Sequence, residues 1–294
     1  MDPVEAQFLD YSMLFNFVEI LGLAFLFALV SETVWDVIAG RRKKLGETFA
    51  NGTIAIVTAL LERTFYGIIF IVGLLLVTPL AVFEMPQGWW SVPLAVLAAD
   101  FTYYWMHRCE HEVRLFWANH SVHHSSPEFN FTTALRISWM DALIEWVFFI
   151  PMILLGFSLV HTVVGLVIVV AYQSWVHTEK VGKLGWLDGV FNTPSVHRVH
   201  HGSNAQYIDK NYGGILIIWD RLFGTFEPES EPVKYGITTP IDSHNPLVIN
   251  FKEYATLWRD LRRADSWPTA FGHLFRPPGW HPKGTNEQKE EAKE

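Results

Sequence analysis

Long apolar segments constrain the fold of this chain more than any other feature of its sequence. A helix of about 20 mostly apolar residues can cross a bilayer, and several segments approach that length. They lie roughly at residues 13–35, 64–83, 90–106, 139–157 and 159–176. The last two meet at Gly156 and Ser158, which predicts a helical hairpin. Acidic residues such as Glu19 and Asp100 interrupt the segments, and we expect them to face the bundle interior or the interface.

The composition supports a membrane protein and narrows the chemistry. Charged residues make up 18% of the chain, whereas soluble proteins average about a quarter. The net charge of −8 argues against nucleic-acid binding, which needs a basic face. Cys109 is the single cysteine, which excludes an internal disulfide, a thiolate zinc site and a cysteine-ligated iron–sulfur cluster. Any metal must therefore be bound by imidazole and carboxylate.

The positive residues predict the orientation in the membrane. Of 22 Lys and Arg residues, four form the run Arg41 to Lys44 and fourteen lie from Lys180 onward. None lies in the N-terminal segment, in loop 84–89 or in the turn 156–158. The positive-inside rule then places the N-terminus outside and the C-terminus in the cytosol.

The predicted fold class is all-α. We expect an integral membrane bundle of about four spans, the last pair a hairpin, capped by a cytosolic helical domain that holds a di-metal site. Residues 1–178 would form the transmembrane region with the first histidine motifs, and residues 179–281 the cytosolic part that completes the site. The charged, apolar-poor segment 282–294 predicts a disordered tail.

Histidines recur in short patterns at one predicted membrane face. The patterns are HRCEH, HSVHH, WVHTE and HRVHH. On a helix, positions three and four apart share a face, so HxxHH and HxxxH can direct several imidazoles to one point. Neutral imidazole suits Zn, Cu, Fe and Ni. The patterns predict these metal ligands: His107, His111, His120, His123, His124, His177, His197, His200 and His201.

The number of these histidines indicates two ions. A structural zinc ion takes four ligands, so nine imidazoles suit two irons or two zincs. HRCEH also matches the H-x-x-E-H zinc-hydrolase pattern, with Glu110 as the base, but that interpretation leaves seven clustered histidines unexplained. We read the remaining histidines as ordinary residues outside the site: His161, His244, His273 and His281.

Residues 90–228 resemble the fatty acid hydroxylase and sterol desaturase superfamily. The resemblance extends beyond the histidines to FWANHSVHHSSPEFNFTTALRIS (116–138) and VHRVHHGSNAQYIDKNYGGILIIWDRLFGTF (196–226). These phrases are most similar to the alkylglycerol monooxygenase-like and C-5 sterol desaturase-like branch. The motif set is highly specific for the superfamily and only weakly specific for the substrate.

The resemblance implies a membrane-bound, non-haem di-iron oxygenase that uses O₂ to hydroxylate or desaturate a lipid, an ether lipid or a sterol among the candidates. It implies the same nine histidines as ligands, and a separate electron donor such as a cytochrome, a ferredoxin or a reduced pterin. In some relatives an HxxxH precedes the last motif, whereas QSWVH begins with Gln173, so one coordination position could be open. Glu112, Gln173 and Asn211 are candidates to contact the metal-binding histidines without binding the metal themselves. Several acids could orient the histidine rings through hydrogen bonds: Glu179, Asp188, Asp209 and Asp220.

Two other functions use the same histidines. A membrane zinc hydrolase would need only the metal cluster and a base. A metal transporter would place its ligands near the middle of the membrane, whereas these motifs map to the cytosolic ends of spans and to loops. The sequence does not identify the lipid, the reaction subtype or the donor.

Overall fold

The computed structural model describes residues 12–41, 45–86, 88 and 90–282. Within these residues the chain is helical and forms no strand, which confirms the all-α class for the described part. Two isolated β-bridges, Phe191 with Leu216 and Gly202 with Tyr235, are the nearest approach to sheet there. The predicted tail lies, from residue 283 onward, outside the described residues.

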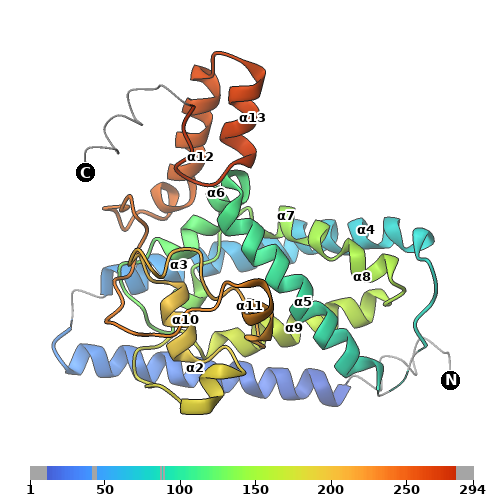
Figure 1. The fold of residues 1–294 in the computed structure, drawn as a ribbon. Helices are drawn as coiled ribbons and strands as arrows, with labels where there is room; N and C mark the ends of the chain where they lie inside the picture. Colours follow the sequence, from blue (N-terminus) through green and yellow to red (C-terminus); the bar gives the residue numbers. More distant parts are fainter. Residues whose placement is uncertain (1–11, 42–44, 87, 89, 283–294) are drawn as a thin grey trace.

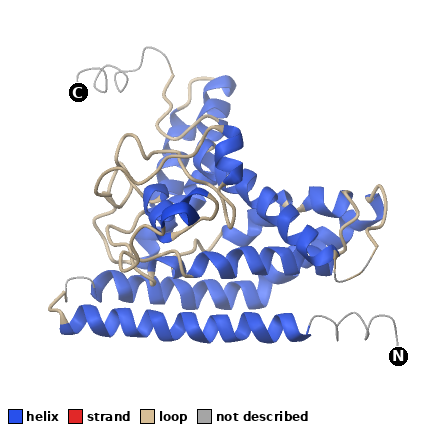
Figure 2. Ribbon diagram, turned by 60° about the horizontal axis from the view of Figure 1, so that its bottom comes forward, coloured by secondary structure: helices blue, strands red, loops and turns tan. Residues whose placement is uncertain are grey.

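The helices differ widely in length, and short ones cluster with the loops (Figure 2). In chain order the α-helices are α2 (Ser12–Ile38), α3 (Leu45–Leu61), α4 (Gly67–Val77), α5 (Ser91–Glu112), α6 (Arg114–His124), α7 (Asp141–Phe148), α8 (Ile150–Leu154), α9 (Leu159–Ser174), α10 (Pro194–His200), α11 (Ile218–Phe223), α12 (Pro246–Arg263) and α13 (Trp267–Phe275). Shorter turns are η2 (Glu62–Tyr66, a π turn), η3 (Thr78–Leu80), η4 (Thr133–Leu135) and η5 (Gly185–Gly189).

Two helical units are long and apolar enough to cross a membrane. They are Phe15–Ile38 within α2 and the continuous run Leu45–Leu80, which joins α3, η2, α4 and η3. Few side chains of either unit are buried inside the protein. Apolar surface on this scale is expected where a protein meets lipid or another protein.

The second unit begins earlier than the sequence predicted. The apolar pattern placed a span at 64–83, but the helix starts at Leu45. The reason is a polar face on α3 that lowers its hydropathy. The guanidinium of the buried Arg136 donates hydrogen bonds to Glu47 and Asn51, and Thr58 Oγ1 donates to a carbonyl of the same loop.

Helices α5 and α9 pack closely and carry the core. A Cβ at Gly165 of α9 would lie 2.8 Å from the Ala95 carbonyl oxygen and from Ala99 Cβ of α5. Small residues of this kind let two helix backbones approach. Asp100, also on α5, accepts hydrogen bonds from the backbone N–H groups of Ile215 and Leu216. That acid therefore fixes a distant loop against α5.

The predicted segment 139–157 is divided, and is not one helical arm. It forms α7 and α8, which are separated at Phe149. Pro151 lies in the first turn of α8, where its missing N–H is tolerated, whereas inside one continuous helix it would break the ladder. The turn before α9 lies where the sequence placed it, with Gly156 at φ 87° and the Ser158 side chain accepting from the His161 N–H.

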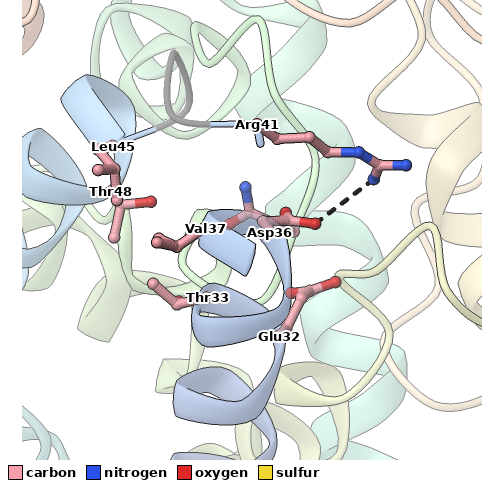
Figure 3. A pocket seen from close by; sticks show the side chains of 8 residues that line it. Glu32, Thr33, Asp36, Val37, Arg41, Leu45 and Thr48 are labelled. Carbon is pink, nitrogen blue, oxygen red and sulfur yellow. Dashed lines mark hydrogen bonds and ion pairs between the residues drawn. The ribbon is translucent and has the colours of Figure 1, made fainter. Parts of the chain in front are cut away.

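Acidic side chains fasten the end of α2 to the rest of the protein. Figure 3 shows this end, where Glu32 and Asp36 line a small cavity. Glu32 accepts hydrogen bonds from the Phe131 N–H and from Thr178 Oγ1, both at 2.7 Å. Asp36 pairs with Lys180 at 3.0 Å. These carboxylates thus connect a membrane-span candidate to the loop that contains His177.

Helices α12 and α13 form a hairpin that projects beyond the other helices (Figure 1). Both pack against α6. The inner side of α12 is buried at Ile249, Asn250 and Leu257.

Candidate metal centre

The first two histidines lie at the end of α5. His107 and His111 are one helical turn apart, and both are buried, with 1% and 6% of their surface exposed. The chain then bends at Val113, whose extended backbone (φ −120°, ψ 114°) ends α5 and starts α6. The bend brings the HSVHH segment of α6 next to the histidines of α5.

The HxxHH spacing divides its histidines between two directions. On α6, His120 and His124 are four residues apart and share one face, whereas His123 is rotated from His124 by about 100°. The same geometry applies to HRVHH, where His197 and His201 are four residues apart and His200 lies between them. This second motif occupies α10, which starts at a Thr193 side chain that accepts from the Val196 N–H.

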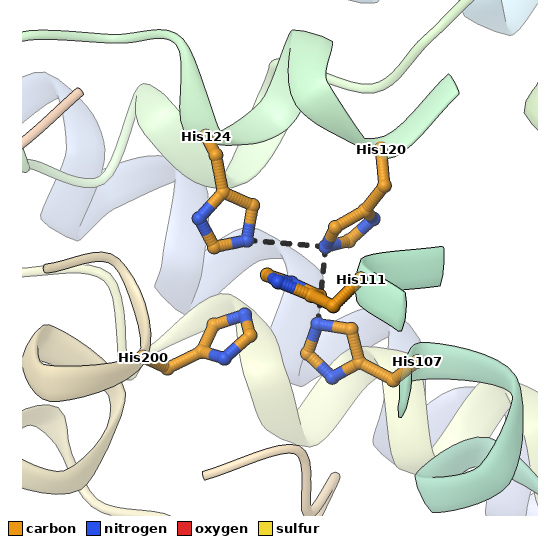
Figure 4. A group of neighbouring side chains, drawn as sticks. All are labelled: His107, His111, His120, His124 and His200. Atoms are coloured by element: carbon orange, nitrogen blue, oxygen red, sulfur yellow. Dashed lines mark hydrogen bonds between the residues drawn. The ribbon is translucent and has the colours of Figure 1, made fainter. Parts of the chain in front are cut away.

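The structure gathers the nine histidines into two groups. Within each group one nitrogen of every ring lies within 4.8 Å of the others. The five-histidine group, drawn in Figure 4, consists of His107, His111, His120, His124 and His200. The four-histidine group consists of His123, His177, His197 and His201. The groups are adjacent, because the stacked rings of His124 and His201, one from each group, have centroids 4.3 Å apart.

Burial lowers the pKa of eight of the nine clustered imidazoles and so favours their neutral form. Burial, followed by the neighbouring His111, lowers the pKa of His107 to about 3. Burial likewise lowers the pKa of His177 to about 4. A neutral imidazole carries one N–H and one unprotonated nitrogen, so the partner of one ring nitrogen fixes the state of the other.

In the five-histidine group, two unprotonated nitrogens face each other. His107 Nδ1 lies 2.9 Å from the Tyr212 carbonyl oxygen, which can only accept, so this nitrogen carries the hydrogen. His120 Nδ1 lies 3.2 Å from Glu110 Oε2, and with that oxygen as the acceptor its hydrogen lies on Nδ1. The two Nε2 atoms are then left with lone pairs, yet they are 3.0 Å apart. When both rings are neutral in these states, no hydrogen lies between the two Nε2 atoms.

The four-histidine group repeats this arrangement. His123 Nδ1 donates to the Arg136 carbonyl oxygen at 3.3 Å, and His177 Nδ1 donates to the Gln173 carbonyl oxygen at 2.9 Å. Their Nε2 atoms are 3.2 Å apart. A cation between the rings removes the repulsion of the lone pairs.

Further inward-facing nitrogens fit the same explanation. Within the described residues, the Nε2 atoms of His111, His200 and His201 are buried without a hydrogen-bond partner. Buried polar groups are normally satisfied. A donor set made only of neutral imidazole suits iron, zinc or copper, and not magnesium or calcium. The residues present therefore fit two transition-metal ions.

A short loop orients two rings of the five-histidine group through its carbonyls. His107 uses the Tyr212 carbonyl, and His200 Nδ1 donates to the Lys210 carbonyl at 3.0 Å. Asp209 and Asn211 in this loop have φ values of 59° and 60°, a left-handed conformation that non-glycine residues rarely adopt. Such strain persists only where surrounding contacts hold it.

Two polar side chains hold that loop in place. Asn211 Nδ2 donates to the Val196 and Glu227 carbonyls, and its oxygen accepts from the Glu227 N–H. The Asp220 carboxylate accepts from the N–H groups of Tyr212 and Gly213 at 2.7 and 2.8 Å. Neither side chain bonds directly to a histidine, and both act through the loop backbone.

The other candidates behind the ligands lie in different surroundings. Gln173 contributes its backbone carbonyl to His177, while its amide turns back to the Val169 carbonyl at 3.4 Å. Glu112 is partly exposed and pairs with Arg108 at 2.8 Å. Asp188 accepts from Thr193 Oγ1 and so supports the start of α10. His161 lies apart from both groups and bonds to Ser91 Oγ at 2.8 Å.

Sequence reasoning missed the roles of Glu110 and Arg136. Glu110 matched a hydrolase base, but its carboxylate contacts the outer nitrogen of His120. Glu110 lies three residues after His107 and one before His111. This spacing does not predict whether its side chain points toward the histidines or away from them. Burial, then Asp141 and Glu145, raise the pKa of Glu110 well above its usual value. In either protonation state it keeps an oxygen that can accept from the ring.

Nothing in the sequence indicated a role for Arg136, which is simply a charged residue after a loop with few apolar residues. It is fully buried, and its Nε donates to the Val122 carbonyl at 2.9 Å. Val122 belongs to HSVHH, and the Arg136 carbonyl receives the hydrogen of His123. This residue therefore fixes α6 through two separate contacts.

Comparison with known proteins identifies the region that contains these groups. The profile of the fatty acid hydroxylase family matches residues 92–225. Alkylglycerol monooxygenase from Homo sapiens is 44% identical over 199 residues, which are 68% of this chain and 44% of that protein. The protein of the same name from Danio rerio is 46% identical over 197 residues, 66% of this chain and 43% of that protein.

A bacterial relative is more distant. Ornithine lipid hydroxylase OlsE from Rhizobium tropici is 34% identical over 161 residues, 52% of this chain and 48% of that protein. The chain thus spans less than half the length of these curated relatives. No solved structure matches it. Residues 92–225 include all nine clustered histidines; this region is a fatty acid hydroxylase domain, and over it the chain is alkylglycerol monooxygenase-like.

Proposed function

We propose that this chain is a membrane-bound, non-haem di-iron oxygenase that oxidises a lipid with O₂ and electrons from a separate donor. The observation that carries the proposal is the pair of adjacent imidazole groups whose unprotonated nitrogens face inward. The identity to alkylglycerol monooxygenases supports an oxidative reaction. None of the matches described above supports the zinc-hydrolase alternative.

The nine histidines would hold the ions, five around one and four around the other. Two irons at these positions would supply the redox chemistry needed to attack an unactivated C–H bond. The chain's own contribution is positioning and exclusion of water. The carbonyls of Lys210 and Tyr212 fix the rings of His200 and His107, and burial keeps the rings neutral so that they can bind cations.

The proposed substrate is a membrane lipid with a long apolar chain. Two of the relatives are named for alkylglycerol and one for ornithine lipid, which are chemically different head groups. We propose an ether lipid as the first candidate, with hydroxylation next to the ether oxygen, and sterol-type oxidation as the nearest alternative. The donor would be a cytochrome, a ferredoxin or a reduced pterin.

The proposed topology has about four spans, with the N-terminus outside and the metal centre on the cytosolic side. Residues 1–178 would form the transmembrane part, and 179–281 the cytosolic part that completes the centre. The distribution of Lys and Arg supports this orientation. The ties from Glu32 and Asp36 of α2 to Thr178 and Lys180 support a close connection between the two parts.

Metal analysis and turnover of a lipid panel test the proposal together. We expect two irons per chain after expression with iron, and lipid oxidation that requires both O₂ and a reductant. His200→Ala should abolish turnover while the protein still folds. His244→Ala is the matched control, because this histidine lies outside both groups and its side chain is 59% exposed; it loses a contact with Glu47 Oε1 at 2.8 Å, so its melting temperature is measured beside the parent. Zinc alone after iron-replete expression would refute the oxygenase.

A further inference from the structure

The outer face of α13 is apolar and exposed within the part of the chain that the structure describes. Trp267, Phe271 and Phe275 follow one another at four-residue spacing and are 87%, 64% and 45% exposed. The rings of Phe271 and Phe275 lie 4.6 Å apart, so they form one continuous aromatic surface. Of the described residues, Trp280 and Pro282 line a hollow together with Phe271 and Phe275, and Trp267 is the most exposed of the three aromatic side chains.

The inner face of the same helix is tightly packed at two residues. Gly272 and His273 are buried, and a Cβ at Gly272 would lie 2.3 Å from the ring of Trp280. The outward direction of the aromatic residues is therefore fixed by tight packing behind them. It does not result from a loosely held helix.

The aromatic face is flanked by unpaired positive charge. Arg259, Arg262 and Arg263 end α12 and are exposed. In the described part of the chain none of them forms an ion pair with an acid. The acids of α12, Glu253 and Asp260, are already paired with Arg114.

This local charge is opposite to that of the whole chain, which carries a net charge of −8. Asp265, between α12 and α13, accepts a hydrogen bond from Thr269 Oγ1 at 2.8 Å and keeps its charge, but the exposed arginines of α12 outnumber it. Arg276, just after α13, adds a further exposed cation. The hairpin therefore presents a positive rim that is complementary to an anionic surface.

The direction of the hairpin suits a membrane surface. In Figures 1 and 2 it runs across the direction of α2, the long span candidate. A hairpin that lies across a spanning helix runs along the membrane plane. In Figure 1, α13 is drawn on the side of α12 that faces α7 and α4. Interfacial helices combine Trp and Phe on one face with Lys or Arg beside it, and cytoplasmic leaflets carry anionic lipid.

The hairpin is joined rigidly to the helix that carries HSVHH. Arg114 begins α6, is 5% exposed, and pairs with Asp260 at 2.6 Å and Glu253 at 3.3 Å. Its backbone N–H donates to the Arg276 carbonyl at 3.1 Å. These contacts connect the hairpin directly to the start of α6.

We propose that α12 and α13 form a membrane-docking arm, whose aromatic face enters the lipid–water interface while its arginines bind anionic head groups. Through Arg114 the arm sets the depth of the metal centre relative to the bilayer surface. The proposal rests on the membrane location given above but not on the proposed reaction. It applies equally if the enzyme oxidises a different lipid or binds a different metal.

Fluorescence in nanodiscs tests the arm without any activity measurement. The full chain with Cys109→Ser receives an NBD probe at Phe271→Cys or, as the control, at Ala205→Cys, an exposed position on a polar loop. We expect a blue-shifted emission and quenching by doxyl-labelled lipid at 271, and neither effect at 205. Adding phosphatidylglycerol to phosphatidylcholine should increase the quenching at 271. Arg259→Gln, Arg262→Gln and Arg263→Gln together should remove that increase.

Two results would overturn the proposal. In the first, the probe at 271 behaves in nanodiscs like the probe at 205. In the second, the probe at 271 is already shielded in detergent, in proportion to protein concentration, and crosslinks to another chain. That result would make the aromatic face an interface between copies. Melting temperatures of the labelled variants, measured beside the parent, establish that each variant is folded.

Discussion

Removing the carboxylate that contacts His120 should weaken metal binding in the five-histidine group. In the structure Glu110 Oε2 is the partner of His120 Nδ1 at 3.2 Å and fixes which nitrogen faces the group. Glu110→Ala frees the ring to rotate and to exchange its hydrogen. Loss of a partner behind a metal-binding histidine typically costs 10–100-fold in affinity, which corresponds to about 1.4–2.8 kcal/mol. His107 and His200 keep their carbonyl partners, so we expect the lower end of that range.

Competition with a chelator measures this effect. Iron-loaded protein in nanodiscs is equilibrated with increasing chelator, and the iron that remains bound is measured. For Glu110→Ala we expect bound iron to leave at about tenfold lower chelator than in the parent. Glu110→Gln keeps an oxygen that can accept from Nδ1 and should lie close to the parent.

The chain supplies a matched control two residues away. Glu112 lies on the same helix but pairs with Arg108 and contacts no histidine of either group in the described structure. Glu112→Ala should therefore release iron at the parent chelator concentration. The reasoning is refuted if Glu110→Ala holds both ions as tightly as the parent, or if Glu112→Ala loses iron to the same extent.

Three further predictions follow from contacts around the groups. Arg136→Met leaves the buried Glu47 without its guanidinium partner, and should destabilise the protein by about 3–5 kcal/mol; thermal melts should show a large fall that Glu47→Gln, added to the same chain, partly restores. Asn211→Ala removes three hydrogen bonds from the loop that orients His107 and His200, at about 1–3 kcal/mol, and should lower iron retention; an unchanged iron content would contradict this role. Removing the metal should lower the melting temperature, since a ligand at 100 times its Kd adds about 2.7 kcal/mol to the stability of the folded state; equal melts with and without chelator would argue against ions between the rings.

The sequence predicted best the features that depend on short-range spacing. The i, i+3 and i+4 intervals of HSVHH and HRVHH are properties of any helix, so the proximity of His120 to His124 follows from the sequence. The division of each motif between two groups was not predicted, because it depends on how α6 and α10 face each other. That arrangement comes from the bend at Val113 and from the capped start of α10.

Hydropathy located apolar segments well and helix boundaries less well. It missed the start of the second long helix at Leu45, because α3 turns Glu47, Asn51 and Thr58 toward the protein. It also treated residues 139–157 as one arm, although α7 and α8 are separated at Phe149, just before Pro151 in the first turn of α8. In the first case polar side chains contact residues that are distant in the sequence, and in the second a proline limits the backbone. The mean hydropathy of neighbouring residues contains neither effect.

The division of HxxHH between the groups has a consequence for how the centre assembles. Helix α6 contributes His120 and His124 to one group and His123 to the other, and the HRVHH segment does the same with His200 on one side and His197 with His201 on the other. An ion bound in either group therefore also restrains the two segments, α6 and HRVHH, that contribute histidines to the other group. Loading should consequently be cooperative, with the first ion lowering the entropic cost of the second. The two ions form one thermodynamic unit, and a stable half-filled enzyme should be rare.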